Sequence, residues 1–427
     1  MRYDKIVFGC LMLAGVLAGC SQYDFNQEYA KEMKDLLPDF DMYNVEVAKM
    51  DFGREAAGKT AHVYSQDGVN VMNVFLDENG RFEGRFRGEV RNGSKWRTTV
   101  DEGPVGSGKR KVAMMPQHGY YIFEDIWTMK KGDFDLNDVI VEYSYSDSIV
   151  MEDGRRYLEE LVIDIKPRHS GTEHVDGFAL QLPEFITTLR DADRITSIRV
   201  NGGEDLKNKS SLWRKISPSN SDMNGAKINT KKLDDRFTYE FFKDIHDVPA
   251  GTAYRLVVTF DTSKEKCVTP EEWNEMCHPA GALADRKNAY KYRWDYNPFI
   301  TVHDISVGSV LDSADDAVYI EVHLPFYPFT ESGIPSAAQA GSQAYSNDWH
   351  LWYVCAVGAG SSGNLAEVKW FYPFALDVPY SDAFRPCMEG MKISNCYAGF
   401  TNWMRKIGAN ENWFTFPYAN HVQPFNK

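Results

Sequence analysis

The chain carries the stretch Gly132-Asp133-Phe134-Asp135-Leu136-Asn137-Asp138 between two apolar runs, residues 120–123 and 139–141. Four of these seven side chains end in carboxylate or amide oxygens. Asp and Asn are poor strand formers, so a cluster of them between two strand-like runs predicts a turn. Hard cations such as calcium are bound by oxygens of this kind, and the stretch therefore indicates ion binding before it indicates catalysis.

The predicted calcium turn differs from an EF-hand loop. Asp133, Asp135 and Asn137 take the first, third and fifth positions of such a loop, but Asp138 stands where the loop requires glycine. Calcium takes about 6 to 8 oxygens, so further ligands are needed from across the fold. The predicted ligands are Asp133, Asp135, Asn137, Asp138, Glu124 and Asp125. The alternative is that the spaced side chains only bond their own backbone as Asx turns.

The N-terminus predicts export and lipidation. Arg2 and Lys5 precede an uncharged run over residues 6–18 that closes in Leu17-Ala18-Gly19-Cys20. This is the pattern of a signal peptide over residues 1–19, and the apolar run is shorter than the ~20 residues that a membrane-spanning helix needs. The ending resembles the lipobox of bacterial lipoproteins, which implies that Cys20 becomes a lipidated N-terminus. Residues 20–55 are polar and are expected to form a tether.

Charge and cysteine content narrow the partners and the compartment. A net charge of −14 argues against nucleic acid as a partner. Disulfides persist in an export compartment, so the nearby pairs Cys267 with Cys277 and Cys387 with Cys396 are candidate bridges. Cys355 lies in an apolar run and is expected to be a buried thiol.

Short strand-like segments dominate the chain after residue 60. Residues 69–76 and 81–90 flank the turn Asp77-Glu78-Asn79-Gly80 and predict a β-hairpin. Further strands are expected at residues 120–123, 139–145, 158–165, 177–182, 195–200, 237–242, 254–260, 318–324, 351–357 and 368–376. Helices are expected only as insertions, at the capping box that starts at Thr269 and at residues 399–407.

This pattern predicts a mainly β fold, an antiparallel β-sandwich of jelly-roll type with short helical insertions. A small β module over residues 56–112 is expected to precede the sandwich, which would occupy residues 113–427.

A family resemblance extends along the second region. The segments that carry it are Phe123-Glu124-Asp125-Ile126-Trp127, residues 132–143, His174-Val175-Asp176-Gly177-Phe178-Ala179-Leu180-Gln181-Leu182-Pro183, Asn297-Pro298-Phe299-Ile300, Glu321-Val322-His323-Leu324-Pro325 and residues 400–416. In this order they resemble blocks of the LruC-type domain of Gram-negative surface lipoproteins, over residues 120–416. Asp176, where that family tends to show Asn, and an insertion at residues 267–289 depart from the pattern. The resemblance implies an anchored protein of the outer membrane, displayed at the cell surface, and implies no enzymatic activity.

The function expected from the sequence is therefore non-enzymatic binding or adhesion, rigidified by calcium. Aromatic side chains can stack on a glycan or anchor a surface protein, and Trp349, Trp403 and Trp413 are the candidate ligand-binding residues. One alternative is a glycan-acting hydrolase with two carboxylates beside the scissile bond. The other is a structural subunit of a surface fibre or complex.

Overall fold

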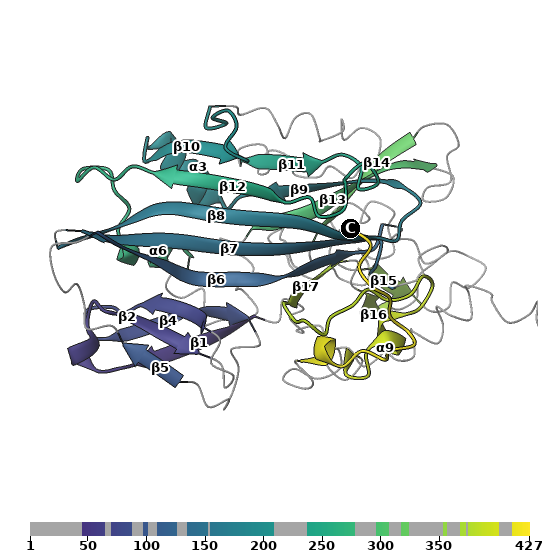
Figure 1. Cartoon of the computed structure of the whole chain (residues 1–427), viewed down its shortest axis with the longest axis horizontal. Helices are drawn as coiled ribbons and strands as arrows, with labels where there is room; N and C mark the ends of the chain where they lie inside the picture. The colour runs from purple at the N-terminus through teal and green to yellow at the C-terminus, as the bar shows by residue number, and fades with distance from the viewer. Residues whose placement is uncertain are drawn as a thin grey trace, which may run out of the picture.

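The computed structural model is mainly β and antiparallel, with a few short helices, which confirms the predicted fold class (Figure 1). The structure describes residues 45–64, 70–87, 97–100, 109–125, 135–152, 154–208, 237–277, 296–306, 317–323, 353–356, 368–372, 375–400 and 412–427. The statements that follow concern these residues.

The larger sheet is built around three long neighbouring strands. Their pairings are antiparallel throughout, and the register runs from Phe123 opposite Val139 at one end to Glu152 opposite Arg155 at the other. The strand order is β10 (Ile195–Val200), β12 (Tyr254–Phe260), β8 (Arg155–Ser170), β7 (Val139–Glu152), β6 (Arg110–Phe123) and β17 (Ala375–Pro379).

A second sheet packs its apolar face against the first. Its order is β11 (Thr238–Phe242), β9 (Val175–Gln181), β13 (Asn297–Ser306) and β14 (Ala317–His323). Phe178 of β9 meets Phe123 of β6 edge to face, with ring centroids 6.2 Å apart. Alternate residues of a strand share one face, so Asp176, Phe178 and Leu180 all point towards the larger sheet. Buried residues of both sheets form one hydrophobic core.

The N-terminal strands form two small sheets with a hydrophobic core of their own, which includes Ala61, Val63, Val74 and Phe82. One sheet pairs β1 (Val45–Asp51) with β4 (Arg81–Arg87), and the other has the order β3 (Asn70–Phe75), β2 (Thr60–Tyr64), β5 (Arg97–Val100). Strand β1 lies in the range that the sequence assigned to the tether. The first described strand therefore starts before the module boundary that we expected at residue 56.

The predicted hairpin of residues 69–90 is wrong. Strands β3 and β4 follow each other in the chain, but they belong to different sheets. Strand β3 pairs with β2, whereas β4 pairs with β1. The turn itself is present, because Gly80 N–H donates to Asp77 O and Asp77 N–H donates to Arg81 O. Beyond the turn, Arg81 is held by Asp51 of β1 through an ion pair of 2.7 Å. A local turn signal cannot reveal that β1 competes for the same strand edge.

Helix α6 (Pro270–Cys277) confirms the predicted capping box. Its first turn is capped by Thr269, whose Oγ1 accepts a hydrogen bond of 3.2 Å from Glu272 N–H. The remaining helical elements are α3 (Glu184–Asp191), α9 (Ile393–Cys396), η1 (Arg54–Ala56) and η5 (Trp413–Thr415), and a separate strand pair joins β15 (Tyr353–Ala356) to β16 (Val368–Tyr372). Most of the helix expected at residues 399–407 lies outside the described residues.

Helix α6 also reaches a buried carboxylate in the larger sheet. The Trp273 ring N–H donates to Asp147 Oδ2 on β7, while the second oxygen of this carboxylate has no hydrogen-bond partner. Burial raises the pKa of Asp147 to about 7, and the bond from Trp273 opposes that rise.

The raised pKa of Asp147 makes folding stability depend on pH. Its ordinary pKa is 3.8 and its folded value is about 7, so the folded state binds the proton more tightly and loses stability as pH rises through this window. We expect Asp147→Asn to be more stable than wild type at about pH 8, by on the order of 3 kcal/mol, with little difference near pH 4. Denaturant unfolding across pH measures this, with exposed Asp191→Asn as control. A constant difference between variant and wild type at all pH values would contradict it.

Candidate metal centre

The connection between β6 and β7 starts and ends at paired residues. Phe123, the last residue of β6, lies opposite Val139, the first residue of β7. Glu124 and Asp125 directly follow Phe123, and Asp138 directly precedes Val139. The strand register therefore places the two acidic arms of this connection side by side.

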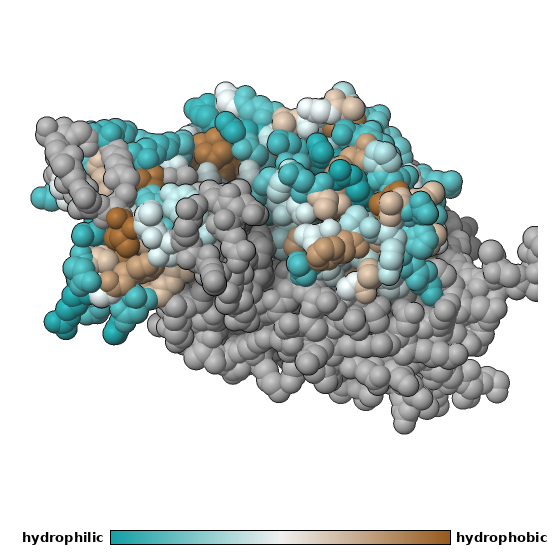
Figure 2. Space-filling view, turned by 60° about the horizontal axis from the view of Figure 1, so that its bottom comes forward, coloured by the Kyte–Doolittle hydropathy of each residue, from teal (hydrophilic) through white to brown (hydrophobic). Residues whose placement is uncertain are grey.

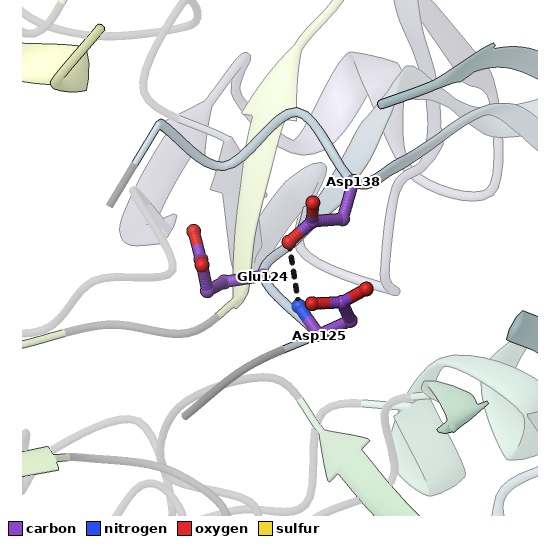
Figure 3. Close-up of side chains that lie close together, drawn as sticks. All are labelled: Glu124, Asp125 and Asp138. Atoms are coloured by element: carbon purple, nitrogen blue, oxygen red, sulfur yellow. Dashed lines mark hydrogen bonds between the residues drawn. The ribbon is translucent and has the colours of Figure 1, made fainter. Parts of the chain in front are cut away.

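Glu124, Asp125 and Asp138 form one group of buried carboxylates (Figure 3). Each offers an oxygen that lies within 4.8 Å of an oxygen of the other two. The three residues are 1 %, 2 % and 6 % exposed, respectively. The backbone N–H of Asp125 donates to Asp138 Oδ2 at 2.7 Å, which locks the two arms together. Ligand oxygens lie about 2.3 to 2.6 Å from calcium, hence within about 5 Å of one another, so this spacing fits one ion.

The electrostatics of the group disfavour three free carboxylates. Burial raises the pKa of Asp138 well above its ordinary value, and the neighbouring charges of Asp125, Glu124 and Asp135 raise it further. Burial also raises the pKa of Asp125, although the Thr172 hydroxyl that donates to it acts in the opposite direction. Ionised carboxylates are costly to bury unless a positive charge accompanies them. A divalent cation would supply that charge.

Asp135 and Asn137 have a different, structural arrangement. Asp135 accepts the backbone N–H of Asn137 two residues on, at 3.2 Å, which is the Asx turn considered above. It also accepts the Gly390 N–H at 2.9 Å, and Asn137 Nδ2 donates to Cys387 O at 3.1 Å. These bonds fasten the turn to the C-terminal segment, and Asp135 does not belong to the group of three carboxylates.

The backbone between Asp135 and Asn137 is held in an unusual conformation. Leu136 has a φ of +55°, which costs a non-glycine residue on the order of 1 kcal/mol. Its side chain is buried in the main core and its N–H donates to Glu124 Oε2 at 3.4 Å. Across the turn, a Cβ at Gly171 would lie 2.1 Å from Asn137 Oδ1, so only glycine fits there. Packing on both sides therefore fixes the geometry of the turn.

Sequence reasoning missed two residues beside this group, Thr172 and Asp176. Thr172 Oγ1 donates to Asp125 Oδ2 and accepts the His174 N–H at 2.8 Å. Asp176 on β9 is fully buried, and neither of its carboxylate oxygens has a hydrogen-bond partner. The sequence did offer one signal for Asp176, which is a charged residue at the start of an otherwise apolar strand.

The other predicted site residues are not brought together. Asp133, Cys20, Trp349 and Trp403 lie outside the described residues. The prediction that Trp413 contacts a ligand at the surface is wrong, because Trp413 is only 2 % exposed. Its ring packs against Tyr397, Phe400 and Phe414, with centroids 5.1, 5.0 and 5.8 Å away. Burial of so large an apolar surface stabilises the fold and removes the ring from solvent.

The two predicted disulfides are also wrong. Among the described cysteines, no bridge joins Cys267 to Cys277 or Cys387 to Cys396. The Cys396 thiol instead points at backbone oxygens, 3.2 Å from His421 O and 3.5 Å from Met391 O. Closeness in sequence does not orient two thiols towards each other. The side chain of Cys355 lies outside the described part of the structure.

Comparison with solved structures finds a distant likeness. A protein from Bacteroides ovatus, provisionally described as a lipoprotein, aligns with a TM-score of 0.41 and 13 % identity, over 90 % of this chain and 100 % of its own. No curated protein matches the chain. Within the described residues, no helix is both long enough and apolar enough to cross a membrane.

A family model gives the clearest relationship. It is described as a domain of unknown function, DUF4842, and matches residues 157–414, more than half of the chain. The match starts after the acidic turn, whereas the resemblance to LruC-type domains began with it, and the matched description does not carry the LruC name. The matched region includes most of β8 and all of β9 to β17, and thus the second sheet with Asp176. This chain therefore belongs to the DUF4842 family.

Proposed function

We propose that this protein is a lipid-anchored, non-enzymatic binding protein of the outer-membrane surface, and that a structural calcium ion closes its β6–β7 connection. The observation that carries the proposal is the buried group of Glu124, Asp125 and Asp138. Calcium prefers carboxylate oxygens and tolerates irregular geometry, which suits a turn between strands. Backbone carbonyls or water would complete its coordination.

The burial of the same group favours a structural role over catalysis. A glycosidase needs two carboxylates that reach opposite sides of a glycosidic bond, about 5 to 10 Å apart. Glu124, Asp125 and Asp138 are nearly inaccessible to solvent and crowd within 4.8 Å. A sugar ring does not fit between them.

Binding would use aromatic side chains at the surface, with a glycan or a surface protein as ligand. Trp349 and Trp403 remain candidates, and the described residues add exposed apolar side chains in the C-terminal region, at Tyr380, Met388, Phe416 and Tyr418. On the coloured part of the face in Figure 2, hydrophobic side chains occur in several small groups separated by hydrophilic ones. Small apolar spots within a polar surface suit a glycan, which offers both C–H faces and hydroxyls.

Anchoring and binding are tested separately. In cells, wild type should fractionate with the outer membrane and be cleaved by external protease, whereas Cys20→Ser should be released to the soluble fraction. On a glycan array, wild type should bind a defined set of sugars, and Phe416→Ala or Tyr418→Ala should weaken that binding. Membrane association of Cys20→Ser equal to wild type would contradict the anchor. Release of product sugars from polysaccharides would overturn the binding role in favour of hydrolysis.

A further inference from the structure

Asp176 is a buried carboxylate that the calcium site described above leaves unexplained. It is fully buried at the start of β9, and both of its oxygens lack a hydrogen-bond partner. Leaving a buried carboxylate without partners costs several kcal/mol, so such a group calls for a counter-charge.

The position of Asp176 in the fold directs it at the acidic turn. It shares the inward face of β9 with Phe178, which packs against Phe123. Phe123 is the residue immediately before Glu124 and Asp125. Asp176 therefore approaches the turn from the second sheet, whereas Glu124, Asp125 and Asp138 lie on the connection between two strands of the first sheet.

The charges around Asp176 are repulsive. Burial raises its pKa well above the ordinary value, and the neighbouring carboxylates of Asp125 and Asp244 raise it further. Asp244 is engaged elsewhere, because its Oδ1 accepts from the backbone N–H and the ring of His246, both at 2.8 Å. His174 is a basic neighbour of Asp125, but the charges acting on Asp176 are acidic.

Asp176 lies too far away to be a ligand of the ion that Glu124, Asp125 and Asp138 would bind. Two ligands of one calcium lie within about 5 Å of each other. Within the described residues, the oxygens that meet a 4.8 Å limit come from Glu124, Asp125 and Asp138, and Asp176 is not among them. Asp125 is nevertheless close enough to Asp176 for its charge to raise the pKa of Asp176.

We propose that Asp176, Asp125 and the Thr172 hydroxyl hold a second divalent cation, of the calcium class, with Asp125 bridging the two ions. This inference rests on the proposed calcium site only in sharing Asp125. The second ion links β9 to the β6–β7 connection, and so joins the two sheets at the edge where both arms of the turn meet. Asp176 can supply both of its oxygens, and water completes the coordination.

The test counts calcium ions in full-length protein that is first stripped with a chelator, then equilibrated with calcium chloride and analysed by elemental mass spectrometry. Wild type should hold two ions per chain. Asp176→Asn should lose one ion and keep the other, Asp138→Asn should likewise keep one, and Asp125→Asn should hold none. Asn is isosteric with Asp and removes a repulsive charge, and circular dichroism verifies that each variant is folded. Exposed Asp191→Asn is the matched control and should hold two.

The possible failures are distinguishable. One ion in wild type that Asp176→Asn retains would overturn the second site and leave the first intact, as expected if Asp125 and Asp176 merely share a proton. If wild type holds one ion, and Asp138→Asn and Asp176→Asn each lose it, the two proposed sites are replaced by a single larger site. If Asp176→Asn still holds two ions, Asp176 is not a ligand of either ion. No ion in wild type would contradict both calcium sites.

Discussion

Asp138→Asn should change the sign of its effect on stability when calcium is added. Without calcium, the variant should be more stable than wild type by on the order of 1 to 2 kcal/mol, because it removes a buried charge that three neighbouring carboxylates repel. The Asn oxygen can still accept the Asp125 N–H. With calcium at about 1,000 times the dissociation constant of the site formed by Glu124, Asp125 and Asp138, that site should stabilise wild type by about 4 kcal/mol. The variant lacks this contribution and should become the less stable protein.

Thermal unfolding with excess calcium and with a chelator measures this crossover. The advantage of the variant in chelator should shrink as pH falls towards about 4, because a carboxyl with a raised pKa is then protonated in wild type and no longer repelled. Exposed Asp191→Asn should unfold like wild type with calcium and with chelator, both at neutral pH and near about pH 4. Equal destabilisation of Asp138→Asn with and without calcium would mean that the side chain acts only as a hydrogen-bond acceptor.

Phe178→Ala should destabilise the protein by about 3 to 5 kcal/mol, with or without calcium. Phe178 is fully buried between the sheets, and its ring contacts Phe123, Phe241 and Phe242 at centroid distances of 6.2, 6.0 and 5.9 Å. Truncation removes this apolar surface and leaves a cavity that strands on both sides cannot easily fill.

Denaturant unfolding measures this loss, and Phe178→Leu gives a folded intermediate case with a smaller cost. Phe416→Ala is the matched control, because Phe416 is 61 % exposed and its truncation should change stability by less than about 0.5 kcal/mol. A loss below about 1 kcal/mol for Phe178→Ala would mean that the two sheets do not pack through this ring.

The sequence predicts most of the strands, although not β1, β5 or β13, and it predicts their partners poorly. Residues 195–200 and 254–260 were expected as strands with the bounds that β10 and β12 have, because apolar, β-branched runs report local preference directly. The hairpin of residues 69–90 failed for the opposite reason. Its turn is real, but the partner of β4 is β1, which lies 30 residues away at the Asp51–Arg81 ion pair. Pairing between distant segments leaves no local signal.

The candidate metal centre was predictable to the extent that its ligands lie close in sequence. Glu124, Asp125 and Asp138 flank one strand connection, so the composition of that connection was enough to find them. The division of roles was not visible, since Asp135 looks equivalent to Asp138 until the backbone donors around it are known. Asp176 comes from the second sheet, and only the packing of the sheets brings it to the turn. Trp413 shows the converse, because composition alone does not separate a buried ring from an exposed one.

A crystal structure grown with calcium, with an anomalous difference map, tests the central claim most directly. Calcium at the β6–β7 connection predicts a strong peak about 2.3 to 2.6 Å from oxygens of Glu124, Asp125 and Asp138, which Asp138→Asn should abolish. A wild-type map without a peak between these three carboxylates, at calcium concentrations that saturate known calcium proteins, would contradict the claim.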